Sequence, residues 1–162
     1  MIVIGPISKY NNDFMFDVIM DPPLNVSYYC GMISNIVSAI PNIGGHRCIN
    51  DDNLLVIEEL SCGMVPHLLE HVIVELHRPF MHICGAVGGL TEWDWRDGHN
   101  FGTFKMSISA INRSFIPVAI HSGIEIINAS TCESAVEDIR DIMMKSEKVA
   151  KMILASPILC SD

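Results

Sequence analysis

The segment PHLLEHVIVEL, residues 66–76, carries the most informative pattern in this 162-residue chain. Its apolar periodicity predicts a helix, with Pro66 in the first turn, where a missing backbone N–H costs nothing. His67 and His71 are four residues apart, so their imidazoles lie on one face of that helix, with Glu70 beside them. Two imidazoles at this spacing can converge on one cation, and tetrahedral zinc most often uses such a pair.

The order His-x-x-Glu-His is the inverted zincin pattern, in which the carboxylate takes a proton from water activated by the metal. On this interpretation His67 and His71 are metal ligands and Glu70 is the general base. The helix can dock and still present these groups, because Leu68 and Val72 belong to a separate apolar stripe. The alternative is a helix with two histidines and no chemistry, because a five-residue pattern also arises by chance.

Glu75 lies one turn further along the same face of this helix. It could orient an imidazole without binding the metal itself. It would be a poor third ligand, because eight residues of helix separate it from His67 by about 12 Å. We therefore expect the third ligand to come from elsewhere in the chain.

Length and composition predict one domain covering residues 1–162. Apolar residues make up 49% of the chain and charged residues 18%, which excludes an intrinsically disordered protein. The net charge of −9 argues against nucleic-acid binding, which needs a basic face. An acidic surface would accept a cationic or arginine-bearing substrate, although acidity more often serves plain solubility.

The six cysteines contain no C-x-x-C pair, so they form neither a disulfide framework nor a zinc ribbon. We expect no secretory leader and no membrane association, because no apolar run reaches the roughly 18 residues of a membrane span. Free thiols favour a reducing cytoplasm, and the sequence allows a homo-oligomer. The cysteines are Cys30, Cys48, Cys62, Cys84, Cys132 and Cys160.

Hydrophobic periodicity predicts a chain of mixed strands and helices. The expected strands are 1–4, 14–20, 54–60, 80–84 and 101–111, and the expected helices are 24–40, 66–78, 114–129 and a last one ending near Ala155. A capping box of Ser130 and Glu133 should open that last helix. Strands outnumber any clean βαβ alternation, so we predict an α+β single-domain sandwich of one mostly antiparallel sheet with helices on one face. The polar and aromatic segment 91–100 either shapes a pocket or forms a surface hairpin.

The segment PNIGGHRC (41–48), an acidic strand and the helix of residues 66–76 together resemble the N-terminal domain of cyanophycin synthetases. That domain similarly carries an H-x-C segment, a strand with a glycine turn, and an H-x-x-E-H-x-x-x-E-L helix. The resemblance is good over residues 41–76 and weak through the rest of the chain. Because this chain has no ATP-binding module, the resemblance implies the domain's metal-dependent hydrolysis of the Asp–Arg polymer and not its synthesis. By this match His67 and His71 would be ligands and Glu70 the general base.

The third ligand is left open. His46 matches the H-x-C segment and could approach the helix from the preceding loop, or it could pin the glycine-rich loop through a structural hydrogen bond. Cys132, Glu133 and Glu147 are the distal candidates. Cys48 is more often a small buried residue than a ligand.

The leading hypothesis is a hydrolase of a peptide-type amide bond that uses zinc or another divalent metal, acting on a peptide or small-molecule substrate that is arginine-bearing or cyanophycin-like. The alternative is a non-catalytic peptide- or protein-binding module that retains the fold, which departures from the synthetase pattern near Gly63 and Ser107 favour. A third hypothesis is a lyase or isomerase of a thiol-containing metabolite with Cys132 as ligand, because H-x-x-E-H also resembles the motif of S-ribosylhomocysteine lyases and insulinase-type peptidases.

Overall fold

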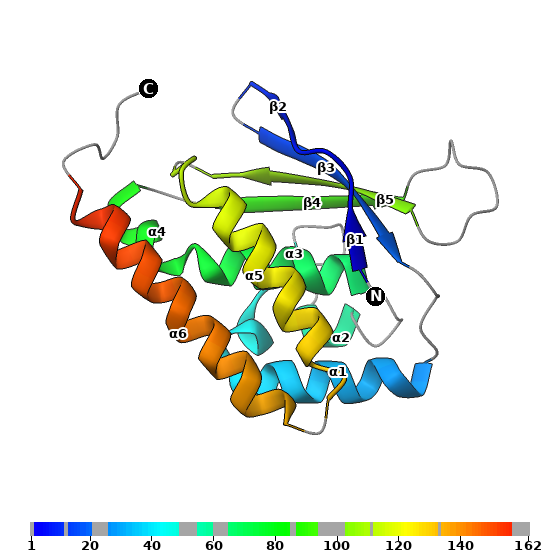
Figure 1. Ribbon diagram of the computed structural model, residues 1–162. Helices are drawn as coiled ribbons and strands as arrows, with labels where there is room; N and C mark the ends of the chain where they lie inside the picture. Colours follow the sequence, from blue (N-terminus) through cyan, green and yellow to red (C-terminus); the bar gives the residue numbers. More distant parts are fainter. Residues whose placement is uncertain are drawn as a thin grey trace.

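One sheet, with helices on one side of it, makes up the described part of the structure (Figure 1). This computed structural model describes residues 2–11, 13–20, 26–48, 55–59, 65–84, 87–93, 103–110, 112–132 and 134–156. All strand pairs of the sheet are antiparallel, and Figure 1 shows the helices gathered on one side of it. The predicted α+β sandwich, with helices on one face of an antiparallel sheet, is therefore confirmed.

The sheet has the strand order β1-β3-β5-β4, and β2 also pairs with β3. Its strands are β1 (Ile2–Ile4), β2 (Ser8–Tyr10), β3 (Asp13–Met20), β4 (Gly88–Trp93) and β5 (Thr103–Ser109). The first predicted strand and the strand expected at 14–20 are both present and pair with each other, with Ile2 opposite Met20 in the antiparallel register. Phe104, Met106 and Ile108 of β5 are buried, as the alternation of the sequence predicted.

The helical layer follows much of the predicted order. It contains α1 (Val26–Ala39), the 3-10 helix η1 (Pro41–Gly45), α2 (Val56–Glu59), α3 (Val65–Leu76), α4 (Arg78–Cys84), α5 (Ile116–Ala129) and α6 (Ala135–Leu154). Pro41 ends α1, as expected, since its ring cannot continue the helix. None of the helices in the described parts of the chain combines the length and the apolar character that a bilayer crossing requires.

Two predicted strands are wrong, and both segments form helix instead. Within 54–60, Leu55 makes an isolated bridge with Arg47 and the chain then turns into α2. Here the Leu55 N–H donates to Glu58 Oε2 at 2.9 Å, the return half of a capping box, which stabilises the short helix. The segment 80–84 lies in α4, with Pro79 in its first turn. A short apolar run looks the same in a strand and in a buried helix.

The expected capping box of the last helix is also wrong in position. Ser130 ends α5, where its Oγ donates to the Ile127 carbonyl at 2.6 Å. The cap residue of α6 is Ser134, whose Oγ lies 2.6 Å from Asp138 Oδ2. Glu133 lies outside the described residues.

Helix α3 is held on several sides, which fixes its orientation in the layer. Leu69 and Ile73 are fully buried, and each burial contributes about 2 kcal/mol to folding. A Cβ added to Gly123 of α5 would lie 3.0 Å from Leu69 Cδ1 and 3.0 Å from Ile73 Cγ1, so α3 and α5 cross in close contact. The side chains of α3 that face β4 and η1 are therefore rigidly placed.

Candidate metal centre

The two histidines of α3 point at one another with their Nε2 atoms. His67 Nε2 and His71 Nε2 are 3.1 Å apart, and their rings are tilted by 45°. The spacing of four residues on one helix brings them together, as the sequence predicted. His67 is half-buried and His71 is buried, so both nitrogens face a shared, partly desolvated point.

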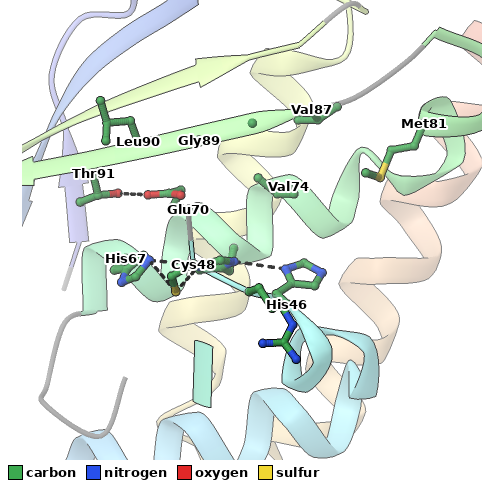
Figure 2. A pocket seen from close by; sticks show the side chains of 13 residues that line it. His46, Cys48, His67, Glu70, Val74, Met81, Val87, Gly89, Leu90 and Thr91 are labelled. Atoms are coloured by element: carbon green, nitrogen blue, oxygen red, sulfur yellow. Dashed lines mark hydrogen bonds between the residues drawn. The ribbon is translucent and has the colours of Figure 1, made fainter. Parts of the chain in front are cut away.

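Cys48 completes a triangle with these two nitrogens. Its Sγ lies 3.6 Å from His67 Nε2 and 3.6 Å from His71 Nε2. The three ligand atoms all lie within 4.8 Å of one another, and Figure 2 shows the side chains of Cys48 and His67 next to each other. Cys48 was expected to be a packed small residue; the structure places it where the third ligand was expected.

The dimensions of this triangle fit a tetrahedral zinc ion. With Zn–N of about 2.0–2.1 Å and Zn–S of about 2.3 Å, tetrahedral angles require about 3.3 Å between two nitrogens and about 3.6 Å between sulfur and nitrogen. The structure has 3.1 Å and 3.6 Å. A buried cluster of one thiol and two imidazoles can therefore hold a metal ion in its present geometry.

His46 lies outside this triangle and contacts the other nitrogen of His71. The two Nδ1 atoms are 3.2 Å apart, and His46 Nε2 lies 3.0 Å from Glu75 Oε2. Arg78 Nη1 and Asn42 Nδ2 both donate to Glu75 Oε1, at 3.2 and 3.0 Å. Glu75 thus orients an imidazole, as the sequence suggested, and that imidazole is the ring of His46. His46 in turn contacts His71, and its hydrogen bonds hold the loop in the way that the second interpretation of His46 expected.

One arrangement of protons satisfies this chain of contacts. An ionised Glu75 only accepts, so the proton of His46 is on Nε2 and its Nδ1 accepts from His71 Nδ1. The lone pair of His71 is then on Nε2, which faces His67 and Cys48. This is the tautomer that a metal ligand needs.

Burial keeps His71 neutral. Desolvation, helped by the neighbouring His67 and His46, lowers the pKa of His71 from 6.5 to about 3. At neutral pH its imidazole therefore carries a lone pair and no positive charge. A neutral imidazole is the form that binds zinc.

Glu70 reaches from α3 toward β4. Its Oε2 accepts a hydrogen bond from Thr91 Oγ1 at 2.5 Å, and the residue is 7% exposed. Gly89 makes room for it, because a Cβ at that position would lie 2.4 Å from Glu70 Cγ. Glu70 is not part of the three-atom cluster, but it lines the same cavity, of about 400 Å³, as Cys48, His67 and His71 (Figure 2).

Two of the distal ligand candidates, Cys132 and Glu147, do not join the cluster. Cys132 is exposed at the turn between α5 and α6. Glu147 is exposed on α6, where it pairs with Lys151 Nζ at 2.7 Å. Glu133 and most of the polar segment 91–100 lie outside the described residues; Thr91 and Glu92 belong to β4.

The sequence held a signal for Cys48 in the spacing H-x-C. Arg47, between the two residues, forms a bridge with Leu55, and His46 has extended backbone angles, φ −65° and ψ 145°. In extended chain, residues two apart point to the same side. His46 and Cys48 therefore both face α3, one toward Glu75 and the other toward the Nε2 atoms.

Comparison of the chain with protein-family models gave no match, and comparison with curated proteins gave none either.

Proposed function

We propose that this protein is a zinc-dependent hydrolase of a peptide-type amide bond, with an arginine-bearing or cyanophycin-like chain as the candidate substrate. The observation that carries the proposal is the spacing of Cys48 Sγ, His67 Nε2 and His71 Nε2, which matches tetrahedral zinc. The resemblance of residues 41–76 to the cyanophycin synthetase N-terminal domain supports the substrate class, which the geometry leaves open.

The number of ligand atoms that the described residues offer is that of a catalytic zinc site. Structural zinc is closed by four protein ligands, whereas catalytic zinc has three and leaves a position for water. Among the described residues the cluster offers three ligand atoms, and it borders a cavity of about 400 Å³. This supports hydrolysis over the alternative of a non-catalytic binding module.

The chain's own residues supply the other parts of the reaction. Zinc, when bound, would acidify a water molecule and polarise the scissile carbonyl. Glu70 would take the proton of that water and pass it to the leaving amine as the C–N bond breaks. Thr91 Oγ1 donates a hydrogen bond to the carboxylate of Glu70, which limits the rotation of the carboxylate. The apolar side chains of Val74, Met81 and Val87 line part of the cavity.

The position of Cys132 argues against the lyase hypothesis. It required Cys132 at the metal, and Cys132 is exposed at the α5–α6 turn and outside the cluster.

Cys30, Cys48 and Cys132 form no disulfide, which supports the proposed reducing, cytoplasmic location.

Metal content and turnover test the proposal. Purified protein should contain about one zinc per chain, and Cys48→Ala and His67→Ala should each lose it. Glu70→Gln should retain zinc and lose about 10²–10⁴-fold in turnover of cyanophycin or of a blocked arginine-bearing peptide. Glu125→Gln, an exposed carboxylate on α5, is the matched control and should change neither quantity. Wild-type protein without zinc after growth in zinc-supplemented medium, or full zinc binding by Cys48→Ala, would contradict the proposal.

A further inference from the structure

Strand β4 lies at one end of the sheet. It pairs with β5 from Gly88 opposite Ser109 to Trp93 opposite Phe104. In the strand order β1-β3-β5-β4 it has no second partner among the strands that the structure describes. Its other edge pairs with no strand in the described part of the chain, and an edge of this kind can accept another extended chain.

Successive side chains of β4 point to opposite faces of the sheet. Gly89 and Thr91 face α3, where both contact Glu70. Leu90, between them, is 56% exposed, and Gly88 and Glu92 are exposed as well. The strand thus has the alternation of a regular edge strand.

The cavity of the metal centre runs along the edge of β4 that faces away from β5. Four consecutive residues of β4, Gly88 to Thr91, line this cavity together with Cys48, His67 and His71. Consecutive side chains point to opposite faces, so a cavity that touches all four residues reaches them from the strand edge. Figure 2 shows the backbone from Val87 to Thr91 passing over the cavity, opposite His67 and Cys48.

We propose that an extended peptide binds as an additional strand along the edge of β4, which places one of its amide bonds beside the metal ligands. Main-chain hydrogen bonds to β4 supply the affinity, as in other cases of strand addition. The proposal rests on the proposed function and deepens it, because it names an extended polypeptide chain as the class of substrate.

The cavity wall also indicates which side chain fits beside the metal centre. Val74 of α3, Met81 of α4 and Val87 before β4 form an apolar wall at one end of the cavity. In an added strand every second side chain points toward this wall. A side chain of the size of Leu or Met, next to the bond that is held at the metal, complements it, and an arginine-bearing residue of the proposed substrate would lie at another position of the added strand.

The edge of β4 lacks most of the usual protection against strand addition. Natural edge strands carry Lys, Pro or bulges that prevent pairing with another chain. The sequence of β4 is GGLTEW, with Glu92 as its one charged residue, and Gly88 to Thr91 carry no charge. An unprotected edge next to a buried ligand cluster is what a binding strand requires.

Backbone methylation of a peptide probe tests this inference on the zinc-loaded protein. The probe is acetyl-Ala-Ala-Ala-Leu with a fluorescent label, made with a C-terminal hydroxamate and with a C-terminal carboxamide, so that Leu lies next to the group that is held at the metal. Each form is also made with one N-methyl group at each backbone nitrogen in turn. Strand addition predicts that methylation at alternate positions weakens binding about tenfold, and that the intervening positions change it less than twofold, because only every second N–H faces β4. Fluorescence anisotropy measures the dissociation constants.

A protein variant tests the apolar wall. Val74→Phe should weaken the Leu probe about tenfold and leave the same probe with Ala in place of Leu within twofold, because the added ring fills the space for the larger side chain. Met144→Phe on the exposed face of α6 is the control and should change neither.

The outcomes separate this inference from the proposed function. A hydroxamate that binds no more tightly than the carboxamide contradicts the metal centre, whereas alternation along the carboxamide series still supports strand addition. Tight hydroxamate binding without period-two alternation leaves the metal centre intact and overturns strand addition. No binding of any probe at millimolar concentration also overturns strand addition.

Discussion

His46 Nε2 lies 3.0 Å from Glu75 Oε2. This contact connects a carboxylate at the end of α3 to the candidate metal centre through His46, which lies in the preceding loop. His46 then contacts His71 Nδ1 with its own Nδ1 at 3.2 Å. The carboxylate itself is fixed by Arg78 and Asn42. The three side chains His71, His46 and Glu75 therefore hold one another in a single orientation and leave His71 Nε2 free to bind a metal.

Replacing Glu75 tests this chain of contacts. Glu75→Ala should weaken zinc binding about 10–100-fold, because His46 and then His71 lose their fixed orientation. Glu75→Gln keeps an acceptor oxygen for His46 and should lose less. Competition with a chelator at fixed pH measures the affinity, and Glu125→Ala, in an exposed pair with His121, is the control. Equal losses in the Gln and Ala variants would show that the carboxylate acts through its charge and not through packing or orientation of His46.

Gly89 sets the position of Glu70. In Gly89→Ala the new Cβ would lie 2.4 Å from Glu70 Cγ and 2.8 Å from its Cδ, so the carboxylate must move. A displacement of about 1 Å of a catalytic group costs about 100-fold in rate, and we expect a loss of this size with zinc content unchanged. Gly31→Ala on α1, where a Cβ meets no atom within 4 Å, should keep full activity. Turnover of the Gly89 variant at the wild-type rate would exclude Glu70 as the general base.

The crossing of α3 and α5 depends on Gly123. Gly123→Ala places a Cβ 3.0 Å from Leu69 Cδ1 and from Ile73 Cγ1, which should cost about 1–3 kcal/mol through overpacking. The higher helix propensity of Ala offsets about 1 kcal/mol of this loss. Gly31→Ala gains the propensity without the contact, so urea unfolding should give changes of opposite sign for the two variants. A stabilised Gly123→Ala protein would show that the two helices separate easily at this point.

Two buried histidines make the metal-free protein sensitive to acid. The pKa of His71 is lowered to about 3, first by burial, and burial also lowers the pKa of His77. Between the folded pKa and the unfolded value of 6.5 the unfolded chain binds protons that the folded chain does not. Stability is therefore complete above about pH 6.5 and falls as the pH drops below it, by up to about 1.4 kcal/mol per pH unit for each histidine. For His71 this window extends down to about pH 3.

His77 provides a matched variant for this pH dependence. Its Nδ1 donates to the Ile73 carbonyl at 2.8 Å, and the ring packs edge-on against Phe115. Among the described residues its Nε2 has no hydrogen-bond partner. His77→Asn keeps a donor near the same carbonyl but does not titrate. Urea unfolding of the metal-free protein at pH 7 and pH 5.5 should show a smaller loss for the variant than for the wild type. Identical pH dependence of the two proteins would remove His77 from the explanation.

The sequence predicted those parts of the fold in which local and tertiary preferences agree. α3 has a full apolar stripe and a proline in its first turn, and β5 has strict alternation, so both were placed correctly. The segments 54–60 and 80–84 were assigned to strands because their apolar runs are short. Their backbone is helical because Val56 and Phe80 pack into the core from the helical layer, away from the sheet.

The candidate metal centre was likewise predicted in part by the sequence and in part decided by the tertiary structure. The sequence by itself determined that His67 and His71 share one face of a helix, because residues four apart are neighbours on any α-helix. Only the tertiary structure decided between His46 and Cys48, since both lie in a short extended segment whose side chains face α3. The distance from that segment to α3 is set by the packing of η1 and the bridge to Leu55. Contacts between distant parts of the chain follow from the packing of the whole fold, and no local pattern of residues encodes them.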